Sequence, residues 1–201
     1  MKKQINGQLI WFISSFIVFH IILLIMHGEK EVFWYLYTGI MMIAGISYVF
    51  YQRDINSKRL LQSIGYGLIG AVCLVILQLI LSSIYSGLSY ASLLKELIHA
   101  GVFYKIQMLV TILIAIPCHE LYMRTILQHQ LQEKFSQPFI SIVISALASS
   151  SLFLYLDDIS IFIFIFLAQF ILSILYFYTR RMITSYIAQV AAIIILVIIF
   201  G

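Results

Sequence analysis

Long apolar runs separated by short polar stretches occupy most of the chain. A helix that crosses a bilayer needs about 20 mostly apolar residues, and about seven runs meet that length. They cover residues 9–26, 32–51, 64–84, 107–135, 138–156, 159–178 and 183–200. The pattern therefore predicts an all-α, polytopic membrane bundle of about seven transmembrane helices.

One stretch, residues 85–105, is less apolar than the runs around it. It carries Lys95, Glu96 and His99, while Leu94 and Leu97 recur at helical spacing. This pattern is typical of an amphipathic helix that lies in the interface between lipid and water.

Composition supports the membrane interpretation. The chain has 201 residues, of which 63% are hydrophobic and only 10% charged. About a quarter of the residues in a soluble domain are charged. We therefore expect residues 1–201 to form a single membrane domain in a lipid bilayer, with no room for a second soluble domain.

The net charge of +4 comes from basic residues scattered through loops, so it does not indicate nucleic-acid binding. Lys and Arg accumulate on the cytoplasmic side of membrane proteins. A cytoplasmic N-terminus places nine basic residues on that side and leaves Lys30, Lys95 and Lys105 on the other. The nine are Lys2, Lys3, Arg53, Lys58, Arg59, Arg124, Lys134, Arg180 and Arg181.

One apolar run contains a polar cluster, formed by His119, Glu120 and Arg124 after Pro117. Such groups are costly in hydrocarbon and normally face a bundle interior or a wet cavity. Glu120 and Arg124 are four residues apart, so they share one helix face. Pro117 is expected to break or kink the helix before the cluster. The simplest alternative is a self-neutralising pair beside an interior histidine.

The cluster resembles the first motif of the CAAX protease and bacteriocin-processing family of intramembrane peptidases. That motif is E-E-x-x-x-R, commonly after a proline, and F-x-x-x-H and H-x-x-x-N/D follow it. Here the first motif falls on residues 119–124, the second on Phe153 to Asp157, and the third on Gln189 and Ile193. The resemblance covers roughly residues 105–195, which we expect to form a CAAX-protease-like core.

The chain departs from the family pattern at its catalytic positions. In the family, the first glutamate activates a water, the second-motif histidine assists it, and the third motif stabilises the oxyanion. Here His119 replaces that glutamate, Asp157 replaces the second-motif histidine, and Gln189 replaces the third-motif histidine. Glu120 and Arg124 keep the family identities, and the resemblance implies that they shape the site.

An inverted pair could still support hydrolysis, with His119 as the base, Asp157 orienting it and Gln189 donating to an oxyanion. The helix register opposes this pairing. His119 precedes the expected turn at Phe135 by 16 residues and Asp157 follows it by 22. The difference of six residues is about 9 Å along a helix. The alternative is that Asp157 and Asp158 only form a turn.

A zinc site is less favoured, because Met123 stands where H-E-x-x-H requires its second histidine. We expect no cofactor.

Two functions follow from the resemblance. The first is an intramembrane peptidase homologue with degenerate motifs, which processes a peptide or protein at the membrane if it is active. The second is a non-catalytic scaffold in bacteriocin immunity or in regulation of a membrane partner. A transporter or channel is less favoured, since only one span is clearly interrupted. We expect a multi-pass protein of the cell membrane. The resemblance implies that this is the cytoplasmic membrane of a bacterium.

Overall fold

The computed structural model describes residues 7–51 and 60–201, with residues 47–51 described by their backbone alone. Within these ranges every regular element is a helix. The α-helices are α1 (Gly7–Ile25), α2 (Phe33–Tyr51), α3 (Leu60–Ile84), α4 (Tyr90–His99), α5 (Lys105–Val110), α6 (Ile116–Glu120), α7 (His129–Lys134), α8 (Pro138–Ser151), α9 (Ile159–Thr179) and α10 (Met182–Phe200). The predicted all-α class is confirmed.

Six helices in the described residues are long and apolar enough to cross a membrane. They are Gly7–Ile25, Leu60–Ile84, Lys105–Lys134, Pro138–Leu156, Ile159–Thr179 and Met182–Phe200, and each matches a predicted span. The remaining predicted span, residues 32–51, corresponds to the 19-residue helix α2. The basic residues Lys2, Lys3, Arg53, Lys58 and Arg59, which carry much of the predicted orientation, lie outside the described residues.

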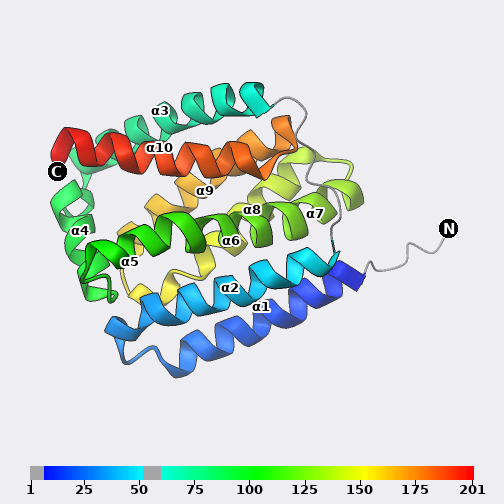
Figure 1. Ribbon diagram of the computed structural model, residues 1–201, viewed down its shortest axis with the longest axis horizontal. Helices are drawn as coiled ribbons and strands as arrows, with labels where there is room; N and C mark the ends of the chain where they lie inside the picture. The colour runs from blue at the N-terminus through cyan, green and yellow to red at the C-terminus, as the bar shows by residue number, and fades with distance from the viewer. Residues whose placement is uncertain (1–6, 52–59) are drawn as a thin grey trace.

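The stretch predicted to be amphipathic contains α4. The Ser89 hydroxyl caps this helix by accepting from the Ser92 backbone N–H at 3.3 Å. Leu94 and Leu97 are exposed. In Figure 1, α4 runs across the end of the bundle between α3 and α5, instead of along the other helices.

A long central helix, Lys105–Lys134, lies between two outer pairs of helices. Figure 1 shows α1 beside α2 on one side and α3 beside α10 on the other. Helix α8 packs against both the central helix and α9. The central helix therefore contacts helices from both sides of the bundle.

Pro117 does not break the central helix. The segment before it, Thr111–Ala115, is π-helical, and the Ile116 backbone N–H bonds to the Thr111 carbonyl five residues earlier. A wider turn makes room for the proline ring, which would otherwise clash with a carbonyl of the preceding turn. A second π-helical segment, Leu121–Gln128, follows α6. One wide turn precedes the polar cluster and the other contains its Arg124. Such π-helical turns are frequent at functional sites.

Two apolar clusters hold the bundle together. The first joins α1, α2 and the central helix through buried residues that include Phe12, Met41 and Leu127. The second joins α3, α9 and α10 through residues that include Ala71, Leu172 and Ala188. Small residues allow helices in membranes to approach closely. A Cβ on Gly67 would lie only 2.8 Å from the Ile187 Cγ2, so α3 and α10 are in close contact there.

Candidate functional site

The predicted pair on the central helix is confirmed. The Arg124 Nε donates to the Glu120 Oε2 at 3.1 Å, and both side chains are 0% exposed. Glu120 ends α6, and Arg124 lies one turn later in the π-helical segment. A buried ion pair is tolerated only when further hydrogen bonds satisfy its remaining donors and acceptors.

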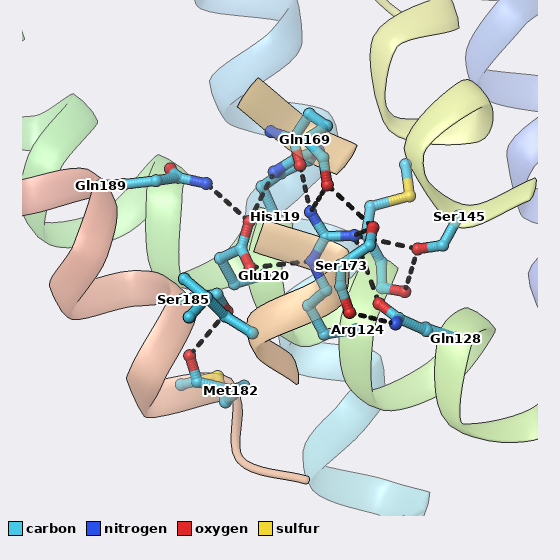
Figure 2. Close-up of polar contacts among 12 residues, drawn as sticks. His119, Glu120, Arg124, Gln128, Ser145, Gln169, Ser173, Met182, Ser185 and Gln189 are labelled. Carbon is cyan, nitrogen blue, oxygen red and sulfur yellow. Dashed lines mark hydrogen bonds and ion pairs between the residues drawn. The ribbon is translucent and has the colours of Figure 1, made fainter. Parts of the chain in front are cut away.

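Those further bonds to the guanidinium come from three helices. Arg124 Nη1 donates to the Ser173 Oγ at 2.6 Å, the Ser145 Oγ at 3.0 Å and the Gln128 Oε1 at 3.4 Å. Its Nη2 donates to the Gln169 backbone carbonyl at 3.3 Å and to the Gln169 side-chain oxygen. Figure 2 shows these groups surrounding the guanidinium. Every nitrogen of the charged group therefore has an acceptor.

Sequence reasoning missed four of these partners as functional residues: Gln128, Ser145, Gln169 and Ser173. Ser145 lies in α8, where it is 0% exposed and accepts from Arg124. A usable signal existed in Gln169 and Ser173, which are polar residues four apart in an otherwise apolar span. Polar residues within membrane helices normally face the interior and pair with one another.

The second carboxylate oxygen of Glu120 is also engaged. The Gln189 Nε2 donates to Glu120 Oε1 at 2.7 Å from α10, and the His119 Nδ1 lies 3.5 Å from the same oxygen. Figure 2 shows Gln189 reaching Glu120 from a different helix than Arg124. The structure thus brings together four of the five predicted residues: His119, Glu120, Arg124 and Gln189.

The other edge of the His119 ring faces an aromatic group. The ring centroids of His119 and Tyr37 are 6.1 Å apart, and those of Tyr37 and Phe153 are 5.2 Å apart. The second-motif phenylalanine therefore approaches His119 through Tyr37. His119 is 2% exposed, and its Nε2 has no hydrogen-bond partner among the described residues.

Asp157 does not join this site, so the predicted His119–Asp157 pair is wrong. The Asp157 carboxylate lies 3.3 Å from the His27 Nε2 and 3.4 Å from the Lys30 Nζ, and it is 48% exposed. Helix α8 ends at Ser151, and the chain continues through the 3-10 turn Leu154–Leu156 to a left-handed Asp157 with φ of 59°. That turn directs the carboxylate to the connection between α1 and α2.

The alternative interpretation of the two aspartates as turn residues is confirmed. Asp158 caps α9, because its carboxylate accepts from the Ser160 backbone N–H at 2.8 Å and from that of Ile161 at 3.3 Å. The Lys30 Nζ also donates to the Leu156 carbonyl at 3.3 Å. Both aspartates therefore stabilise the connection between α8 and α9.

The geometry defines what the site can do chemically. Both Glu120 oxygens are bonded inside the protein, and the Gln189 amide is directed at the carboxylate. The imidazole Nε2 of His119 is the one ring nitrogen of the site without a partner in the described residues. Within residues 7–51 and 60–201, no three His, Cys, Asp or Glu side chains gather in a way that could hold a metal ion.

Comparison with known families finds one matching family model. The family model for type II CAAX prenyl endopeptidase Rce1-like proteins matches residues 101–195. The match spans the central helix and most of α10, and it includes every predicted site residue. No curated protein and no solved structure matches the chain. The predicted resemblance to the CAAX protease family of membrane peptidases is therefore confirmed over residues 101–195.

Proposed function

We propose that this protein is a non-hydrolysing member of its family, a peptidase-shaped membrane scaffold that acts on a peptide or membrane-protein partner by binding it. The first motif has no free carboxylate that could activate a water, and this carries the proposal. His119 stands where the resemblance places the water-activating glutamate, and Glu120 is fully engaged. Its side chain is 0% exposed, and its two oxygens are occupied by Arg124, Gln189 and His119. A general base must instead present a free acceptor within about 2.6–3.2 Å of the proton that it removes.

The other parts expected of a hydrolytic site are engaged elsewhere. Asp157 pairs with Lys30 and His27, so it does not orient His119. Gln189 donates its amide N–H to Glu120, whereas an oxyanion donor must point at the position where the charge develops. These contacts leave neither Asp157 nor the Gln189 amide free for a hydrolytic role, and they support a structural role for both side chains.

One observation favours a second candidate, weak hydrolysis with His119 as the base. Its Nε2 is buried and unpartnered in the described part of the chain, while Glu120 lies 3.5 Å from its Nδ1. A carboxylate beside one ring nitrogen supports general-base chemistry at the other. In this arrangement Glu120 takes the orienting part that the sequence assigned to Asp157.

A cleavage assay separates the two candidates. The full chain is reconstituted in liposomes with a fluorogenic prenylated CAAX peptide, the substrate class that the family description names. We expect the wild type, His119→Ala and protein-free liposomes to release the same signal. The exposed His99 provides a matched control, His99→Ala. Turnover that His119→Ala abolishes and His99→Ala leaves unchanged would overturn the proposal and establish the second candidate.

The binding function is tested in cells. We propose bacteriocin immunity or regulation of a membrane partner, in the cytoplasmic membrane of a bacterium. Expression in a bacteriocin-sensitive strain should protect the cells, and His119→Ala should protect them equally. Protection that depends on His119 would contradict a binding mechanism. Absence of protection by the wild type would reject immunity, while the cleavage assay would still decide whether the protein hydrolyses peptides.

A further inference from the structure

A second polar group lies between α1 and the end of α8 and uses none of the residues around Glu120. The His20 Nδ1 lies 2.8 Å from the Tyr155 hydroxyl, and its Nε2 lies 3.2 Å from the Ser151 hydroxyl. Each hydroxyl also donates to a backbone carbonyl. Ser151 reaches the Ala148 carbonyl at 2.9 Å, and Tyr155 reaches that of His20 at 3.2 Å.

The number of available protons determines which protonation state of His20 allows all four hydrogen bonds to form at once. A hydroxyl has one proton to donate, and a carbonyl can only accept. When both hydroxyls donate to carbonyls, both ring nitrogens of His20 must donate to the hydroxyls. Only the imidazolium has two N–H groups. A neutral ring forces one hydroxyl to leave its carbonyl and donate to the bare nitrogen.

We propose that His20 is a proton-binding site, at which Ser151 and Tyr155 hold the imidazolium and thereby couple α1 to the end of α8. The ligand is the proton itself. Hydrogen bonds to a charged group are about twice as strong as those between neutral groups, so the two hydroxyls favour the charged ring. The Phe16 ring contacts the imidazole in a T-shaped arrangement with centroids 4.6 Å apart, which helps to fix the orientation of the His20 ring.

A small pocket at the connection between α1 and α2 lies beside the Tyr155 partner of His20. The Tyr155 ring lies 6.1 Å from the ring of His27, whose Nδ1 is buried without a partner in the described residues. A pocket beside these two rings is also lined by Glu29 and Lys30. The titratable and charged groups that face this region are Tyr155 and Asp157 from the α8–α9 connection and His27, Glu29 and Lys30 from the α1–α2 connection.

The test follows the protonation of His20 directly. The full chain, with ¹⁵N-labelled histidine, is placed in lipid nanodiscs, and imidazole nitrogen shifts are recorded from pH 4 to pH 8. The chain contains five histidines, and the signal that disappears in His20→Gln identifies the ring. We expect this ring to acquire two N–H groups as the pH falls. A ring that stays neutral over the whole range would overturn the proposal.

Two variants separate proton binding from helix packing. Tyr155→Phe and Ser151→Ala each remove one acceptor from the imidazolium and should weaken proton binding about tenfold, which moves the midpoint about one pH unit lower. Tyr178→Phe and Ser83→Ala, at exposed positions, are matched controls and should leave the midpoint unchanged. Equal midpoints in the wild type and both test variants would show that the contacts only pack the helices.

Discussion

The Glu120–Arg124 pair and the Asp157–Lys30 pair each join a carboxylate to a basic side chain. Their nitrogen–oxygen distances are similar, 3.1 and 3.4 Å. The first pair is 0% exposed on both sides, whereas the side chains of the second are 48% and 47% exposed. Arg124 has further partners on three helices, while Lys30 adds one carbonyl contact. Similar ion pairs therefore occupy very different surroundings in one molecule.

The difference teaches how the family motifs are used in this chain. The first motif forms the centre of the bundle, and Gln189 of the third motif reaches it from α10. The second motif ends at a turn outside that centre, where Asp157 neutralises basic residues of another connection. Of the three motifs that the resemblance implies, the second has its polar residue, Asp157, outside the site.

The largest effect is expected from Arg124→Met. This change leaves Glu120 as an uncompensated buried charge and should lower the free energy of unfolding by about 3–5 kcal/mol. Unfolding in detergent micelles, followed by circular dichroism, measures it. The double variant with Glu120→Leu should lose less than the sum of the single changes, since neither charge is then left alone. A loss below about 1 kcal/mol for Arg124→Met would contradict the central importance of the pair.

A smaller effect is expected from Gln189→Leu, which removes the donor to Glu120 Oε1 and leaves the ion pair in place. Hydrogen bonds to charged groups contribute about 1.5–3 kcal/mol, so we expect a loss of about 2 kcal/mol in the same unfolding measurement. Gln189→Glu should be worse, because it brings a second carboxylate to Glu120. If Gln189→Glu were as stable as the wild type, the contact would not have the assigned donor.

Ser173→Ala should cost about 1 kcal/mol, because Arg124 retains the other acceptors around its Nη1. The exposed Ser83 bonds the carbonyl three residues before it in a different helix, and Ser83→Ala is therefore a suitable control. We expect the control to stay within about 0.5 kcal/mol of the wild type. Equal losses in both variants would mean that Ser173 contributes nothing specific to the charged group.

The smallest effect is expected from Asp157→Asn, below about 1 kcal/mol, since exposed ion pairs contribute little and are screened by salt. The loss should shrink further when the unfolding experiment is repeated at high ionic strength. A loss that equals that of Arg124→Met would remove the distinction between the two regions.

Much of the fold could be predicted from the sequence, because the apolar runs are local features whose length matches a bilayer. The central helix illustrates where local reasoning fails. Pro117 predicted a break or a kink, and the structure excludes the break, because the helix continues through a π-helical segment in which the Ile116 N–H bonds to the Thr111 carbonyl. The central helix packs against α2 and α8 around these turns, so its course is also set by contacts that lie far apart in the sequence.

The sequence by itself determined the all-α membrane class and the pairing of Glu120 with Arg124, because helix geometry places residues four apart on one face. Only the tertiary structure decided which groups surround that pair. Ser145, Ser173 and Gln189 come from three other helices, and their register depends on how those helices pack. The partners of Asp157 were decided in the same way, because the turn after α8 meets Lys30 and His27 only where the helices pack.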